Sequence, residues 1–82
     1  MTSSDAELRA ATDGRPNWQT ASGGAVYTRP GGPECVHVRP VHRPMRRERY
    51  VAVIVSDGRA VHALPCDTAA AAVRWAESVA LR

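Results

Sequence analysis

The spacing of hydrophobic and polar positions predicts an antiparallel sheet in the middle of this chain. Residues 34–41 alternate between apolar and polar side chains, which is typical of a strand with one buried face. A short apolar stretch over residues 25–29 predicts a strand before it, and a turn rich in Pro and Gly separates the two. Two further apolar runs, residues 50–55 and 59–64, also have the composition of strands.

The last two runs form the best-defined unit of the sequence. They flank the dipeptide Asp57-Gly58, and Asp-Gly between apolar runs predicts a β-hairpin with a two-residue turn. This turn pairs Ser56 with Arg59. An unbroken register then pairs Ile54 with Val61. One face of the hairpin would carry Val51, Val53, Val55, Ala60, His62 and Leu64, and the other Tyr50, Ala52, Ile54, Val61 and Ala63.

Beyond Pro65 the period changes to that of a helix. Asp67 or Thr68 is placed to cap a helix that runs to about Leu81. Its apolar residues recur at helical spacing, and we expect them to pack on the face of the sheet that carries the valines of residues 50–55. The stripe contains Ala69, Ala72, Val73, Ala76, Val79 and Ala80, with Trp75 at its edge.

The first part of the chain lacks any such period. Residues 1–22 mix Ser, Thr, Asp, Gly and Pro with scattered Ala, so we expect a disordered arm that buries too little apolar area to fold. Trp18 is the exception, because a tryptophan in a tail usually docks on a surface. The predicted domain is residues 23–82, an α+β fold. It has a three- to four-stranded antiparallel sheet with one C-terminal helix packed on one face.

The composition predicts where the protein is located but indicates little about a reaction. The first ten residues are polar and no apolar run approaches the roughly 20 residues that span a bilayer, so we expect a cytoplasmic protein. Cys35 and Cys66 are too few for a disulfide scaffold and are expected to be free thiols. All 11 basic residues are arginine, which a GC-rich genome also favours through its codons.

The basic charge is concentrated in one stretch. Residues 1–20 carry a net charge of −1, whereas residues 29–49 contain six arginines against Glu34 and Glu48, a net charge of +4. A focused positive patch attracts anions, and phosphate backbones above all. The arginines placed to contact a nucleic acid from this stretch are Arg39, Arg43, Arg46, Arg47 and Arg49.

Several short motifs resemble those of known domains. The segment Val36-His37-Val38 with Pro40, the segment 50–53, and Thr68 with Ala72 resemble the His-Val-x-Pro strand, Trp-x-Val strand and Thr-x-x-x-Ala helix of a small uncharacterised bacterial ββα family. Thr68 and Ala72, with a Trp later in the helix, are also similar to the AP2-like arm-binding domain of phage-type integrases. That resemblance implies a three-stranded sheet with a C-terminal helix and binding of DNA through the sheet.

The candidate ligands and nucleophiles do not form a convincing site. Cys35 and His37 could join His62 and Cys66 as four zinc ligands, but the strand parity places the two pairs on opposite faces of the sheet. Cys66 with His62 is the only nearby pair of nucleophile and base, and no oxyanion-forming loop accompanies it. We therefore predict no enzyme activity, no metal and no other cofactor or small-molecule substrate.

Two functions stay open after these exclusions. The more specific is nucleic-acid binding through the arginine-rich loop, which would weaken steeply with salt. The alternative is a protein partner or a homodimer held by the second apolar face of the sheet, because a sheet with one wet face normally alternates apolar and polar residues. Trp18 could fold back over that face instead. The interface residues of this alternative are Tyr50, Ala52, Ile54, Val61, Ala63 and Trp18.

Overall fold

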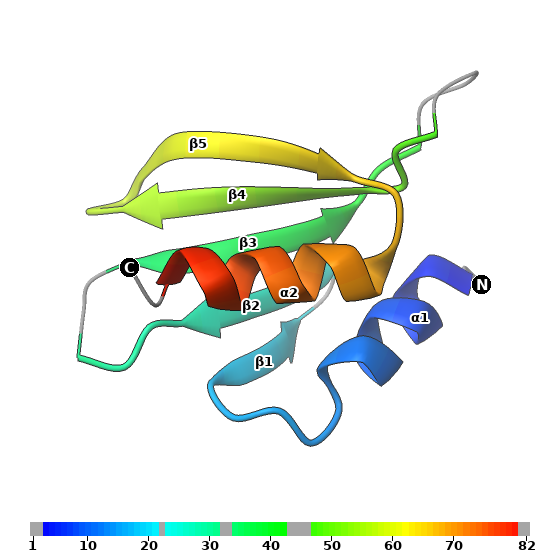
Figure 1. Ribbon diagram of the computed structural model, residues 1–82, viewed down its shortest axis with the longest axis horizontal. Coiled ribbons are helices and arrows are strands. Elements are labelled where there is room, and N and C mark those ends of the chain that lie inside the picture. Colours follow the sequence, from blue (N-terminus) through cyan, green and yellow to red (C-terminus); the bar gives the residue numbers. More distant parts are fainter. Residues whose placement is uncertain (1–2, 22, 32–33, 43–46, 81–82) are drawn as a thin grey trace.

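The structure is a computed structural model that describes residues 3–21, 23–31, 34–42 and 47–80 (Figure 1). It contains five strands and two helices in these ranges. No helix among the described residues is long and apolar enough to cross a membrane. The elements are α1 (Ser3–Thr12), β1 (Trp18–Ala21), β2 (Gly24–Thr28), β3 (Cys35–Pro40), β4 (Tyr50–Ser56), β5 (Arg59–Cys66) and α2 (Ala69–Ala80).

The five strands form one antiparallel meander. Their order in the sheet, β1-β2-β3-β4-β5, is the order along the chain, because each strand returns beside the previous one through a short connection. The predicted α+β class, the antiparallel sheet and the C-terminal helix are confirmed. The sheet has one or two strands more than expected, and α1 is a second helix.

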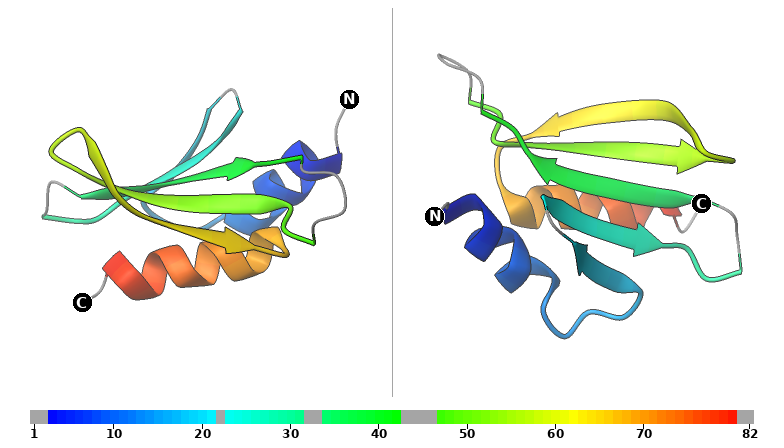
Figure 2. Two further views of the ribbon diagram at one scale, coloured as in Figure 1. Left: turned by 90° about the horizontal axis from the view of Figure 1, so that it is seen from above. Right: turned by 180° about the vertical axis from the view of Figure 1, so that it is seen from behind.

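Both helices lie on the same side of the sheet (Figure 2). α1 packs against β1 and β2, and α2 packs against β3, β4 and β5. The two helices also contact each other, so they form one continuous layer. The core fills the space between this layer and the sheet. Its buried residues are Leu8, Ala25, Tyr27, Val36, Val38, Tyr50, Ala52, Cys66, Ala69, Ala72, Val73 and Ala76.

α1 and β1 occupy the part of the chain in which we expected a disordered arm. Leu8 is the reason that α1 docks: it is only 2% exposed and belongs to the core. Ala11 packs beside it, and the Thr12 hydroxyl donates to the Leu8 carbonyl at 3.1 Å. The boundary at residue 23 is therefore not a boundary between an arm and a domain. A single leucine among small and polar residues produces too weak a period in the sequence to show this.

The start of α2 is capped from two directions. The Thr68 hydroxyl accepts a hydrogen bond from the Ala71 amide at 3.1 Å, as expected for an N-cap residue. The Glu7 carboxylate of α1 accepts a second one from the Ala69 amide at 3.3 Å. A carboxylate also suits the positive end of the helix dipole. Glu7 therefore links the first turn of α2 to α1.

The β4–β5 hairpin contains a β-bulge that changes the predicted faces. Asp57 and Gly58 have φ angles of 53° and 78°, as a two-residue hairpin turn requires. Ser56 pairs with Arg59 as predicted, but the register shifts between Ile54 and Val55. One residue of β5 is then left over at the bulge, and every later pair moves by one position.

Because of the bulge, the β5 residues beyond it lie on the opposite side of the hairpin, relative to β4, from the side that an unbroken register would give them. Ile54 pairs with His62 instead of Val61, and Ala52 pairs with Leu64. His62 and Leu64 therefore share the helix side with Tyr50, Ala52 and Ile54, and the valines of β4 lie on the other side. The prediction for β4 was inverted: the residues expected on the outer face are the ones that α2 covers.

Candidate functional site

No described element covers the side of the sheet opposite the helices (Figure 2, right). We call it the open face. Val36 and Val38 point toward the helices and are buried, so Cys35, His37 and Arg39, which alternate with them along β3, belong to the open face. The same alternation assigns the residues of the other strands. The open face consists of Gln19, Val26, Thr28, Cys35, His37, Arg39, Val51, Val53, Val55, Ala60, Ala63 and Pro65.

The strand register arranges this surface in rows that cross the sheet. The central row runs through all five strands and contains Gln19, Val26, His37, Val53 and Ala63. The rows on either side contain Arg39, Val51 and Pro65 toward one end, and Thr28, Cys35, Val55 and Ala60 toward the other.

The open face is apolar over β4 and β5 and more polar over β1 to β3. Val51, Val53 and Val55 are half-buried by their neighbours alone, and Ala63 and Pro65 beside them are exposed. A solvated sheet face normally carries polar residues at these alternate positions. β4 instead presents three valines to the outside and an apolar set to the core, so this part of the sheet is built like a strand that is buried on both sides.

The interface residues expected from the sequence are divided between the two faces. Tyr50 and Ala52 are 0% exposed under the helices. Ile54 packs against the same core. Ala63 does lie on the open face, and Val61 is 59% exposed at the bulge. Two causes combine: both sides of β4 are apolar, so the sequence did not show which one the helices cover, and the bulge moved Ala63 to the side of the valines.

Trp18 lies on the helix side and does not reach the open face. Its ring packs against Tyr27, with the ring centroids 5.2 Å apart. Its indole Nε1 donates to Glu77 Oε2 at 3.0 Å, and the Arg15 guanidinium binds the other oxygen of Glu77 at 2.8 Å. Glu77 of α2 thus holds both β1 and the segment before it, and sequence spacing alone could not have revealed a contact between residues so far apart.

The described arginines that the sequence placed against a nucleic acid lie at one end of the sheet. Arg39, Arg47 and Arg49 are all exposed. The backbone of Arg49 is fixed, because its carbonyl accepts from the Val41 amide at 2.8 Å and its amide donates to the Cys66 carbonyl at 3.0 Å. Arg43 and Arg46 lie outside the described residues. This end of the open face therefore has three described arginines beside it, with Glu48 among them.

The two pairs of possible zinc ligands lie on opposite sides of the sheet. Cys35 and His37 are on the open face, and Cys66 is buried under the helices. The His62 ring lies 5.9 Å from that of Trp75, also on the helix side. Burial, and secondarily the charge of Asp67, raises the pKa of the Cys66 thiol above its ordinary value, which makes it a poor nucleophile. Among the described residues no three His, Cys, Asp or Glu side chains cluster as metal ligands do.

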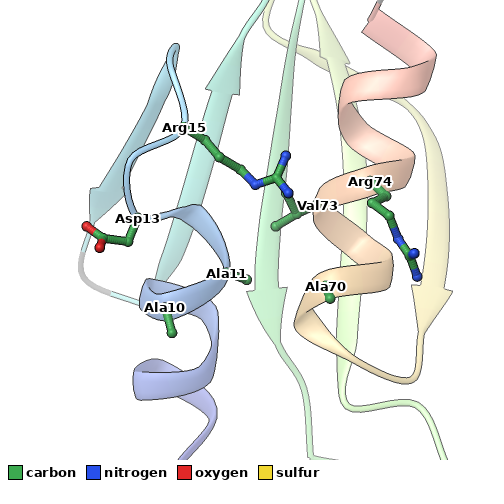
Figure 3. A pocket seen from close by; sticks show the side chains of 7 residues that line it. All are labelled: Ala10, Ala11, Asp13, Arg15, Ala70, Val73 and Arg74. Carbon is green, nitrogen blue, oxygen red and sulfur yellow. The ribbon is translucent and has the colours of Figure 1, made fainter.

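A shallow pocket lies between the two helices (Figure 3). Its volume is about 470 Å³, and small side chains from both helices form most of its lining. Arg15 reaches across toward α2, where Glu77 neutralises it, whereas Asp13 and Arg74 point away on opposite sides. No set of polar groups converges in this pocket.

Comparisons of this chain with protein-family models, with curated proteins and with solved structures find no match. The resemblances to the ββα domains and to the integrase arm-binding domain stay predictions.

Proposed function

We propose that this protein is a non-enzymatic protein-interaction module that works through the open face of its sheet. The observation that carries the proposal is that β4 presents three valines, Val51, Val53 and Val55, on the side opposite both helices. These valines are half-buried, and the part of each side chain that faces water adds no stability to the fold. A protein partner would remove them from water, at about 25 cal/mol for each Å² of apolar surface buried.

The distribution of aromatic residues also favours a protein over a nucleobase on this face. Proteins that bind single-stranded nucleic acid on a sheet stack the bases on exposed aromatic rings. The chain has two Trp, two Tyr and no Phe. Trp18, Tyr27 and Tyr50 belong to strands but face the helices, and Trp75 is part of α2. Over β4 and β5 the open face instead offers valine, alanine and proline, which suit an apolar protein surface.

The test is to capture partners with a tagged copy of the protein in the cells that produce it. Val53→Arg places a charge in the centre of the open face, and Ala70→Arg places the same charge on the exposed side of α2 as a matched control. We expect the parent and Ala70→Arg to retain the same proteins and Val53→Arg to lose them. Partners that bind all three equally would contradict the proposal.

Nucleic-acid binding is a second candidate, supported by the exposure of Arg39, Arg47 and Arg49 at one end of the sheet. Replacing these three residues by Ala should weaken binding to unrelated DNA sequences alike. The slope of log affinity against log salt should shrink by about 0.9 for each phosphate of duplex DNA that the variant no longer neutralises. Lack of binding by the parent protein at low salt would remove this candidate.

A further inference from the structure

We infer that the partner of the open face is a second copy of this chain, stacked face to face with its strands antiparallel to those of the first. The inference rests on the proposed function, because it names the partner of the same surface. It follows from three properties of the open face: its size, the position of its charges and the residues of its central row.

The open face is large enough for a weak dimer. The sheet has five strands of four to eight residues. At the usual strand spacing and rise it measures about 24 by 20 Å, or about 500 Å² for each copy. A pair would bury about 1,000 Å², which is the lower limit of a specific interface. We therefore expect a dissociation constant on the order of micromolar or weaker.

The excess of positive charge at one end of the sheet favours the antiparallel arrangement. One end carries Arg39, Arg47 and Arg49 against Glu48 and Asp67, a net charge of +1, and Arg39 belongs to the open face itself. The other carries Asp57 and Arg59, with Arg29 and Glu34 joined in an ion pair of 3.2 Å, so its net charge is zero. Stacking with parallel strands would superpose the two arginine ends. Stacking with antiparallel strands separates them by roughly 20 Å along β4, which exceeds the screening length in physiological salt.

A two-fold axis through the central row gives this arrangement a signature. The axis runs across the strands, so each residue of the row meets its own equivalent in the second copy. Val53 then contacts Val53, and His37 faces His37. Because the row runs across all five strands, the valines of the two β4 strands also cover each other. The apolar part of each open face is thereby removed from water.

His37 makes the predicted dimer sensitive to pH. Its neighbours on the open face are Val26 and Val53 across the strands and Cys35 and Arg39 along β3, and none of them is a carboxylate. Two facing imidazoles that become charged repel each other, and histidine is the side chain that changes charge between pH 5 and 8. We expect the dissociation constant to rise on the order of tenfold or more between pH 8 and pH 5.5.

A stack with parallel strands lacks this pair of histidines. To cover the valines of β4 with each other, its two-fold axis must run along β4, which superposes β3 of one copy on β5 of the other. His37 would then face Ala63, its counterpart across β4 in the central row. The pH dependence therefore distinguishes the two arrangements.

Sedimentation equilibrium of the full chain at pH 8 is the first test. The parent and Ala70→Arg should form the same concentration-dependent dimer. Val53→Arg should weaken it on the order of 100-fold, because two new charges meet at the axis. Ala63→Arg, at an exposed position of the same row, is a second variant in case Val53→Arg does not fold, which circular dichroism shows. A parent that is monomeric up to several hundred micromolar, or a dimer that survives both folded variants, would overturn the inference.

The pH dependence is the second test. The dimer of the parent should dissociate on acidification, and His37→Gln, which keeps a polar side chain without the charge, should dimerise equally at both pH values. A dimer that loses affinity equally in parent and variant would refute the antiparallel stack.

The captured proteins separate the inference from the proposed function. If the parent is monomeric and captures other proteins in a way that depends on Val53, the inference of a dimer is wrong and the proposed interaction module still holds. A monomeric parent whose captured proteins do not depend on Val53 would remove both.

Discussion

The replacement of Leu8 by Ala tests whether α1 belongs to the folded domain. Leu8 is the large apolar side chain that anchors α1, and it is 2% exposed within the core cluster. Leu→Ala replacements in cores cost about 2–5 kcal/mol of unfolding free energy, and the lower part of that range suits a terminal helix that can adjust around the cavity. We therefore expect a decrease of about 2–3 kcal/mol.

That decrease is large for a domain of this size. A chain of 82 residues is expected to have an unfolding free energy of roughly 4–12 kcal/mol. A decrease of about 2–3 kcal/mol lowers the melting temperature by roughly 10–20 °C. Urea denaturation at constant temperature measures the free energy directly, and its m-value reports whether α1 still unfolds together with the sheet.

Arg9→Ala is the matched control, because Arg9 is the exposed neighbour of Leu8 on the same helix and both variants create alanine. It should change the unfolding free energy by less than about 0.5 kcal/mol. If Leu8→Ala changed the stability as little as Arg9→Ala, α1 would not be part of the core, and residues 1–22 would behave as the disordered arm that the sequence suggested.

Three further changes test other parts of the structure. Gly58→Ala should cost about 1–2 kcal/mol in urea denaturation, because residue 58 has a φ of 78° that a Cβ disfavours, and an unchanged midpoint would contradict the turn. Ala76→Asp should abolish cooperative melting in circular dichroism, since residue 76 is 0% exposed and an unpaired buried charge costs several kcal/mol; an unchanged melting curve would contradict the burial of this helix face. The raised pKa of Cys66, due to burial and then to Asp67, means that the folded state holds the thiol proton more tightly than the unfolded state. The stability that this provides is complete below the ordinary thiol pKa and is lost as the pH rises through the raised value. The difference in unfolding free energy between the parent and Cys66→Ala should therefore fall in alkaline solution, and a constant difference would show that Cys66 is not desolvated.

Local sequence signals determined the elements whose formation depends on neighbouring residues. The Asp57-Gly58 turn needs only two residues that tolerate a positive φ, and it forms as predicted. Thr68 caps α2 because a hydroxyl at that position reaches an amide three residues later. The buried alanines of α2 repeat at helical spacing, so the stripe that packs on the sheet was also visible in the sequence.

Tertiary contacts decided the rest, including the candidate site. α1 forms because Leu8 packs in the core and the Glu7 carboxylate accepts a hydrogen bond from the Ala69 amide of α2, 62 residues away. The bulge in β5 sets which residues of β5 share each side with β4, and packing of α2 sets which side of β4 is covered. When both sides of a strand are apolar, the sequence cannot say which one is buried. Packing of the helices against Tyr50 and Ala52 left the three valines of β4 on the open face.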